Sequence, residues 1–209
     1  MKLYYMPGAC SLAAHIVLAW LGRPYILEKA DTRSQEFLKI NYLSSVPVLF
    51  TEDMGALYQN SAILRYLARL PEGEHLGPGP DPVLQYQCDN WLSFFNADLY
   101  RAFAPHFCAK KYTTDPSQKA IDAIKAAVPA NVAPLLQHMD NHLASRDYYL
   151  EDQRTIVDAC AFVYCLWATL VLPSGLTPYP NVARHFAQMN ADSVVQQVLA
   201  VEGLEAVSA

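Results

Sequence analysis

Val46-Pro47-Val48-Leu49-Phe50 is the stretch that decides the fold of this chain, and it leads into Gln59-Asn60-Ser61-Ala62-Ile63. A proline beside a short apolar run belongs at the edge or the first position of a strand. Ser61 then opens a segment whose apolar residues recur at helical spacing. An exposed peptide unit and a helix N-terminus brought together in this way predict a site for an extended peptide that carries a carboxylate.

The residues around these two stretches predict alternating strands and helices. Strands are expected at residues 2–5, 25–30, 46–50 and 56–58, and helices at residues 11–21, 35–40 and 61–70. The resulting order is β-α-β-α-β-β-α. The sequence therefore predicts an α/β domain over residues 1–77.

A segment rich in proline and glycine, residues 71–82, is expected to be a linker. Beyond it the pattern is helical throughout, and helices are expected at residues 83–107, 117–145, 155–172, 181–189 and 193–201. Pro129 and Pro134 should kink or divide the second of these. Residues 83–209 are therefore predicted to form a second, all-helical domain.

The composition excludes several classes of partner. The chain has 209 residues, of which 53% are hydrophobic and 17% charged, so part of its surface is expected to be buried in a partner. The formal net charge is −5, without a basic stripe, which argues against nucleic acid. The longest apolar stretch, residues 159–172, is too short to cross a membrane. Five cysteines in no disulfide pattern, and no secretory signal after Met1, predict a cytoplasmic location.

Cys10 is the first candidate for catalysis. It lies just before the first expected helix, where backbone N–H groups and the helix dipole stabilise a thiolate. Ala13 stands where a redox C-x-x-C motif has its second cysteine, so the sequence favours chemistry with a thiol from outside the chain. The alternative is a small buried residue that packs the first turn. Ser11 either donates its hydroxyl to the thiolate or only caps the helix.

In order and spacing, these motifs resemble the cytosolic glutathione transferases, and the bacterial beta class in particular. The resemblance is carried by residues 1–13, 45–49, 60–63, 155–159 and 202–204. It implies a thioredoxin-like domain followed by an all-helical domain, glutathione as the co-substrate, and a homodimer. It also implies that Thr155 and Asp158 form a capping box at the start of a central helix.

Several residue roles follow from the resemblance. Val46-Pro47 matches the family's cis-proline site, where the backbone of Val46 pairs with the cysteinyl part of glutathione. Ser61 matches the residue that binds the γ-glutamyl carboxylate. Asn60 stands where the family commonly has Glu or Asp beside the ammonium group of the ligand. Replacing Asn60 with Glu is therefore expected to tighten glutathione binding.

Two further departures lie in the helical half. Tyr100 and Arg101 stand where the class usually has a histidine and a lysine. Tyr100 keeps a hydroxyl donor that can reach Cys10 and the bound thiol, but it does not titrate near neutral pH. Arg101 keeps the positive charge and is expected to help hold the peptide.

The resemblance implies an enzyme that conjugates glutathione to apolar electrophiles, with thiol transfer or peroxidase chemistry at Cys10 as a side activity. The sequence does not separate this activity from dehalogenation or isomerisation. The alternative, kept open by Asn60 and Tyr100, is a non-catalytic relative that uses the fold to carry a ligand or bind a protein partner. His138 and His142 are one helical turn apart, but the glutamate of a zinc protease motif is missing, so no metal site is expected.

Overall fold

A four-stranded sheet forms the first half of the chain in the computed structural model, which describes residues 1–150 and 152–204. The strands are β1 (Lys2–Tyr5), β2 (Ile26–Lys29), β3 (Val48–Thr51) and β4 (Gly55–Tyr58), in the spatial order β2-β1-β3-β4. β1 runs parallel to β2 and antiparallel to β3, and β3 and β4 form a hairpin. The predicted α/β half is confirmed, and the structure shows that its sheet is mixed.

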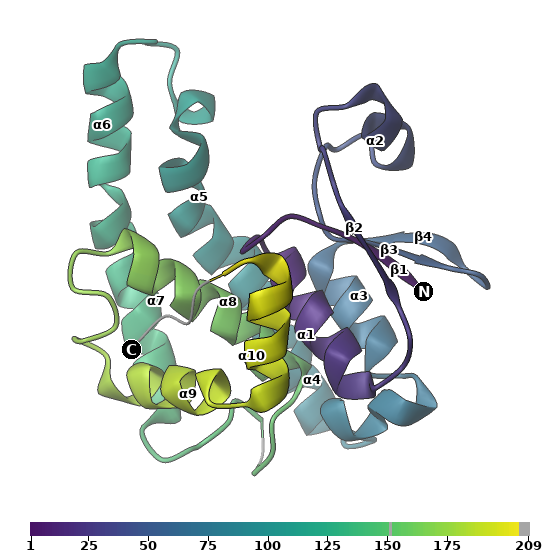
Figure 1. The fold of residues 1–209 in the computed structure, drawn as a ribbon. Coiled ribbons are helices and arrows are strands. Elements are labelled where there is room, and N and C mark those ends of the chain that lie inside the picture. Colours follow the sequence, from purple (N-terminus) through teal and green to yellow (C-terminus); the bar gives the residue numbers. More distant parts are fainter. Residues whose placement is uncertain (151, 205–209) are drawn as a thin grey trace.

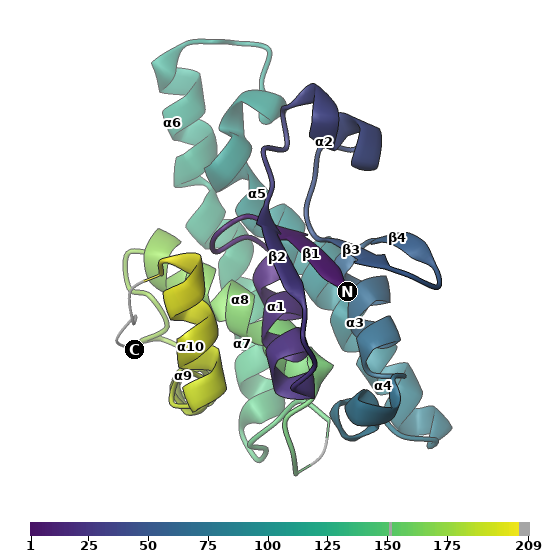
Figure 2. The ribbon, with the colours of Figure 1, turned by 45° about the vertical axis from the view of Figure 1, so that its right-hand side comes forward.

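Three helices accompany the sheet: α1 (Ser11–Leu21), α2 (Gln35–Ile40) and α3 (Asn60–Leu67). α1 and α3 pack side by side against the sheet (Figure 1). α1 has the bounds expected from its periodicity and ends at Gly22, whose φ of 68° is the left-handed value that suits glycine at a helix end. Most of α1 is buried, because it lies between the sheet and the helical half (Figure 2).

The expected linker at residues 71–82 is only partly a linker. Residues Pro71–Leu76 form a 3₁₀ helix, η1, which belongs to the first half. A Cβ at Gly73 would lie 2.2 Å from the backbone oxygen of Leu67, so only glycine allows η1 to pack this closely on the end of α3. Glycine here marks close packing rather than a free connection.

The second half is helical, as predicted. Its elements are α4 (Pro82–Ser93), the π-helical turn η2 (Phe94–Leu99), α5 (Tyr100–Cys108), the short η3 (Ala109–Tyr112), α6 (Gln118–Ala126), α7 (Val128–Leu143), α8 (Ile156–Val171), α9 (Pro180–Asn190) and α10 (Ser193–Glu202). The helix expected at residues 83–107 is thus interrupted by η2. The one expected at residues 117–145 is divided at Ala127, because Pro129 starts α7, whereas Pro134 lies within α7. Within the part of the chain that the structure describes, none of the helices has the length and hydropathy to span a bilayer.

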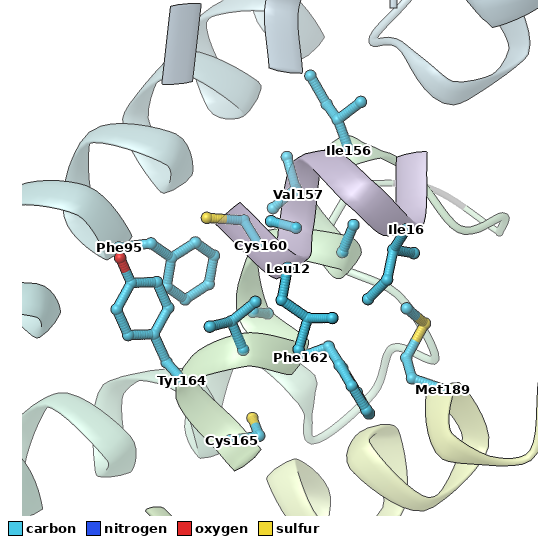
Figure 3. Packing of buried hydrophobic residues seen from close by; sticks show 14 of the residues in the cluster. Leu12, Ile16, Phe95, Ile156, Val157, Cys160, Phe162, Tyr164, Cys165 and Met189 are labelled. Atoms are coloured by element: carbon cyan, nitrogen blue, oxygen red, sulfur yellow. The ribbon is translucent and has the colours of Figure 1, made fainter. Parts of the chain in front are cut away.

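α8 is the central element of the core. It packs against α1 on one side and α9 on another, so it is apolar all round and buried over most of its length. Leu12 and Ile16 of α1, Phe162 and Cys165 of α8, and Met189 of α9 meet in one cluster (Figure 3). A single core therefore joins the two halves and fixes one against the other.

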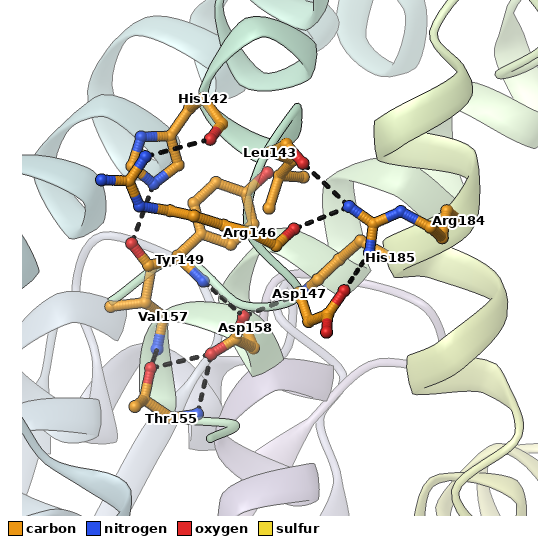
Figure 4. A network of polar contacts seen from close by, with 10 residues as sticks. All are labelled: His142, Leu143, Arg146, Asp147, Tyr149, Thr155, Val157, Asp158, Arg184 and His185. Carbon is orange, nitrogen blue, oxygen red and sulfur yellow. Dashed lines mark hydrogen bonds and ion pairs between the residues drawn. The ribbon is translucent and has the colours of Figure 1, made fainter. Parts of the chain in front are cut away.

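A polar network holds the start of α8 (Figure 4). The Thr155 hydroxyl accepts from the backbone N–H of Val157 at 3.2 Å, and the Asp158 carboxylate accepts from the N–H of Thr155 at 2.7 Å. This is the predicted capping box. The other Asp158 oxygen accepts from the N–H of Tyr149 at 3.1 Å and lies 2.9 Å from Nε2 of His185, so Asp158 also ties the preceding loop and α9 to α8.

Candidate functional site

Cys10 lies at the end of the loop between β1 and α1, directly before the first turn of the helix. Its side chain is half-buried, and the Sγ thiol donates to the backbone oxygen of Val46 at 3.1 Å. The Val46-Pro47 peptide bond is cis, as the resemblance implied. The loop that carries Cys10 and the turn that precedes β3 are thus joined at the thiol.

The protonation state of Cys10 differs from the sequence prediction. Burial raises the pKa of the Cys10 thiol to about 11, although the backbone N–H groups of Cys10 and Ser11 at the helix start act in the opposite direction. Burial opposes the charged form and here outweighs the helix terminus. Cys10 is therefore a neutral thiol at neutral pH, in agreement with its role as a donor to a carbonyl oxygen.

A polar pocket of about 190 Å³ opens beside this thiol. Its walls come from both halves of the chain. The lining residues are Cys10, Asn41, Ser45, Val46, Pro47, Tyr58, Gln59, Asn60, Asn96 and Tyr100. We call this space the polar pocket. It contains five of the eight residues that the sequence singled out for the site.

The start of α3 forms one wall of the polar pocket. Gln59 has a φ of 70° and stands directly before the helix, which begins at Asn60. The first turn of α3 therefore directs its positive end to the pocket. The Ser61 hydroxyl instead donates to the backbone oxygen of Leu92 at 3.3 Å, and Ser61 does not line the pocket. The side chains that line the polar pocket at this helix start are thus those of Gln59 and Asn60, not that of Ser61.

Asn60 is held from the opposite half of the chain. It is 6% exposed, and its Nδ2 donates to Oδ1 of Asn96 in η2 at 3.1 Å. Asn96 in turn donates to the backbone oxygen of Leu92 at 2.8 Å. Sequence reasoning missed Asn96. Its one signal is an amide that directly follows Phe94 and Phe95, and the break in helical phase at η2 that brings it to the pocket is not visible in the pattern.

The remaining predicted residues divide between the pocket and its surroundings. Tyr100, at the start of α5, is 41% exposed and lines the polar pocket, and burial raises the pKa of its hydroxyl. Ser11 is buried and exchanges hydrogen bonds with the backbone of Met6, at 3.2 Å as acceptor and 3.3 Å as donor. Ser11 therefore closes the Cys10 loop. Arg101 is exposed and does not line the pocket.

A second space, the apolar pocket, adjoins the first and has a volume of about 370 Å³. It shares four lining residues with the polar pocket, namely Cys10, Ser45, Val46 and Tyr100. Its other lining residues are Met6, Pro7, Gly8, Ala9, Thr32, Ser44, Phe107, Cys108, Lys111 and Trp167. The Cys10 thiol thus lies where a pocket with polar walls meets one with largely apolar walls.

Aromatic side chains form the outer wall of the apolar pocket. The rings of Phe107 and Trp167 lie 4.9 Å apart between centroids, and Nε1 of Trp167 donates to the backbone oxygen of Gly8 at 2.7 Å. Trp167 therefore holds the Cys10 loop against α8 and also lines the pocket. Phe103 of α5, whose ring centroid lies 5.9 Å from that of Trp167, is instead fully buried in the core.

Two family models and several known proteins match this chain. The family model for the glutathione S-transferase N-terminal domain matches residues 8–70, and that for the C-terminal domain matches residues 122–188. Glutathione S-transferase GST-4.5 of Xanthomonas campestris is 35% identical over 209 residues, which cover 98% of this chain and 100% of that protein. The chain belongs to the glutathione S-transferase family.

Solved glutathione S-transferases share the whole fold. The bacterial beta class enzyme of Sphingomonas chungbukensis is 30% identical, with a TM-score of 0.85 over 98% of this chain and 100% of that one. A sphingomonad glutathione S-transferase complexed with glutathione is also 30% identical, with a TM-score of 0.84 over the same shares. The family and the fold class expected from the sequence are confirmed.

The two histidines that share a helical turn have an aromatic environment. His138 and His142 lie against Trp91, with ring centroids 5.2 Å and 4.6 Å away. Nε2 of His142 is also 2.9 Å from the backbone oxygen of Tyr149. Both side chains thus belong to the packing between α4 and α7.

Proposed function

We propose that this glutathione S-transferase family member binds glutathione in the polar pocket and joins its sulfur to an apolar electrophile held in the apolar pocket. The observation that carries the proposal is the position of the Cys10 thiol at the junction of the two pockets, hydrogen-bonded to the backbone beside a cis-proline. A similar protein solved in complex with glutathione supports it.

The tripeptide would lie along the edge of the first half. The backbone N–H and C=O of Val46 pair with its cysteinyl part as in an added strand, next to Pro47. The γ-glutamyl carboxylate lies at the first turn of α3, where Asn60 and the backbone N–H of Ser61 contribute to a positive helix end. Arg101, exposed on α5 and next in sequence to Tyr100, adds positive charge to this part of the helix without lining the pocket.

The reacting sulfur is that of glutathione, and the protein positions and polarises it. As a neutral thiol, Cys10 is suited to donate a hydrogen bond to the glutathione thiolate. Tyr100, whose hydroxyl stays protonated because burial raises its pKa, is a second donor from the helical half. The sulfur then forms a bond to the electrophilic carbon, and the leaving group departs with the electron pair of the bond that breaks. Ser11 supports this arrangement by closing the loop that holds Cys10.

Thiol transfer at Cys10 is the second candidate activity. It is favoured by the half-exposed thiol at the pocket junction. The Cys10 thiolate would attack one sulfur of oxidised glutathione, form a mixed disulfide and release one glutathione thiolate. A pKa of about 11 keeps this reaction slow at neutral pH, so it is proposed as a side activity.

A homodimer is proposed from the exposed apolar side chains. Phe50 and Met54 of the β3–β4 hairpin are 48% and 59% exposed, and Val83 and Tyr86 of α4 are 59% and 71% exposed. Surfaces of this kind commonly mark interfaces. We expect light scattering to give twice the mass of the 23.3 kDa chain. The five free cysteines are the basis for proposing a cytoplasmic location.

The function is tested by calorimetry with glutathione and by conjugation of glutathione to 1-chloro-2,4-dinitrobenzene. Binding together with turnover is the expected result. Binding without turnover of any electrophile in a panel of halides, epoxides and enones would instead support a ligand carrier. Absence of both would overturn the proposal and favour a partner-binding protein that only keeps the fold.

A further inference from the structure

We propose that Lys111 makes the apolar pocket selective for electrophiles that carry an anionic group beside their apolar ring, such as aromatic carboxylates. The proposal rests on the proposed function, since it names the class of the second substrate. Nothing in the family resemblance assigns a role to this residue.

The first observation is the charge of the pocket wall. Lys111 is the one charged side chain among the residues that line the apolar pocket, and no carboxylate lies among them. Lys111 has no ion-pair partner among the described residues. A cation without a partner at the edge of an aromatic cavity attracts a complementary anion on the ligand.

The second observation is the position of Lys111 relative to the thiol. Tyr100, Phe107 and Cys108 all line the apolar pocket, and their spacing places them on one face of α5. α5 therefore runs along the pocket for about 12 Å, at 1.5 Å per residue. Tyr100 belongs to the end shared with the polar pocket, whereas Lys111 follows the opposite end of the helix, in η3.

The third step is the match between pocket and ligand. An aromatic ring bound between the thiol and the Phe107–Trp167 wall presents its reactive carbon to the Cys10 end. A carboxylate on the far side of the same ring then points toward Lys111. The anion is also kept away from the glutathione sulfur, where two negative charges would repel each other.

The size of the effect is limited by solvent. Lys111 is exposed, and ion pairs at exposed sites gain little because water and salt screen them. We therefore expect about a two- to fivefold preference to depend on Lys111, and we expect this preference to shrink at high ionic strength.

The test uses two electrophiles with the same leaving group and the same two ortho nitro groups, the neutral 2-chloro-1,3-dinitrobenzene and the anionic 4-chloro-3,5-dinitrobenzoate. In Lys111→Met, KM for the benzoate should rise about two- to fivefold while KM for the neutral compound stays unchanged. Lys110→Met is the matched control, because Lys110 is an exposed neighbour of equal charge that does not line the pocket. It should leave both constants unchanged.

A binding experiment tests the same point without turnover. Quenching of tryptophan fluorescence reports binding of 3,5-dinitrobenzoate and of 1,3-dinitrobenzene, and only the affinity of the benzoate should fall in Lys111→Met. The inference would be overturned if Lys111→Met left the preference for the benzoate over the neutral compound unchanged in both experiments. It would also be overturned if Lys110→Met changed this preference by an equal amount. Absence of conjugation and of glutathione binding in the unmodified protein would overturn the proposed function. The affinity for 3,5-dinitrobenzoate relative to 1,3-dinitrobenzene would still decide the role of Lys111.

Discussion

The side-chain amide of Asn60 donates to Oδ1 of Asn96 at 3.1 Å and thereby joins the first turn of α3 to the π-helical turn of the other half. The orientation of Asn96 is fixed because its own amide donates to the Leu92 carbonyl, which can only accept. The side-chain oxygen of Asn96 therefore faces Asn60, and Asn60 donates to it through its NH₂ group. The Asn60 oxygen is buried without a hydrogen-bond partner among the described residues.

This relationship reverses the outcome expected from the sequence for Asn60→Glu. A carboxylate at position 60 would be buried and would face the side-chain oxygen of Asn96. It would then have no hydrogen-bond donor at that position. We predict weaker glutathione binding and a free energy of unfolding lower by about 1–3 kcal/mol. Calorimetry and urea denaturation measure the two effects. Tighter binding at unchanged stability would show that the side chain turns into the pocket instead.

Asn96→Ala tests the other partner of the pair. Removing the acceptor leaves the buried Asn60 amide without its strongest partner, at a cost of about 1–3 kcal/mol in unfolding free energy. Glutathione affinity should fall as well, because the start of α3 loses its fixed position. Ser93→Ala, an exposed change in the preceding turn, is the control. Equal stability of the two variants would mean that the pair contributes nothing measurable.

The pKa of Cys10 predicts how its reactivity changes with pH. A value raised to about 11 means that the thiolate fraction grows about tenfold per pH unit from pH 7 to pH 10. The rates of alkylation by iodoacetamide and of mixed-disulfide formation with oxidised glutathione should rise in the same proportion. Mass spectrometry should find the adduct in Cys108→Ala but not in Cys10→Ala. A rate that levels off below pH 8 would contradict the protonated thiol.

Asp158 is predicted to be the most sensitive polar residue of the fold. Its carboxylate is fully buried, accepts hydrogen bonds from the backbone N–H groups of Thr155 and Tyr149, and contacts His185. In Asp158→Asn, an NH₂ group replaces one of the two carboxylate oxygens. The groups that donate to that oxygen then lose their acceptor. We expect a loss of about 1–3 kcal/mol in urea denaturation for each buried donor that is left without an acceptor. Asp98→Asn, on the exposed side of η2, should change stability little.

Local patterns were enough to predict much of the fold. Apolar periodicity predicted α1, and Thr155 and Asp158 predicted the capping box, whereas the cis peptide bond at Val46-Pro47 was implied by the resemblance of the surrounding residues to the family. Each of these features depends on residues close together in the sequence. The division of the expected helix at residues 83–107 did not follow, because residues 94–99 keep an apolar helical character through the π-helical turn.

The site was less predictable because its details depend on tertiary contacts. The start of α3 at Asn60 follows the positive φ of Gln59, which a residue with a side chain seldom adopts. The Asn60–Asn96 bond joins residues 36 positions apart. The helix start beside Cys10 is visible in the sequence, but the burial that raises its pKa is not. Local chemistry therefore located the site, and packing determined which atoms face it.

Glu202 gives the last prediction, which concerns the loop that carries Cys10. Its carboxylate accepts from the backbone N–H of Gly8 at 2.9 Å and lies 2.8 Å from Nδ1 of His15. Both Glu202 and His15 are buried, so α10 is fastened to the Cys10 loop and to α1. Glu202→Ala should lower the unfolding free energy by about 1.5–3 kcal/mol for each lost charged hydrogen bond.

The same variant should also loosen the loop. With Gly8 released, the Cys10–Val46 contact is no longer held from the side of α10, and the thiol becomes more accessible to water. Faster alkylation of Cys10 at a fixed pH is therefore expected under conditions where the variant is still folded. Glu52→Ala, at an exposed position after β3, is the control. A variant that loses stability but keeps the alkylation rate of Cys10 would limit Glu202 to a role in packing, since the loop would then hold its position without this carboxylate.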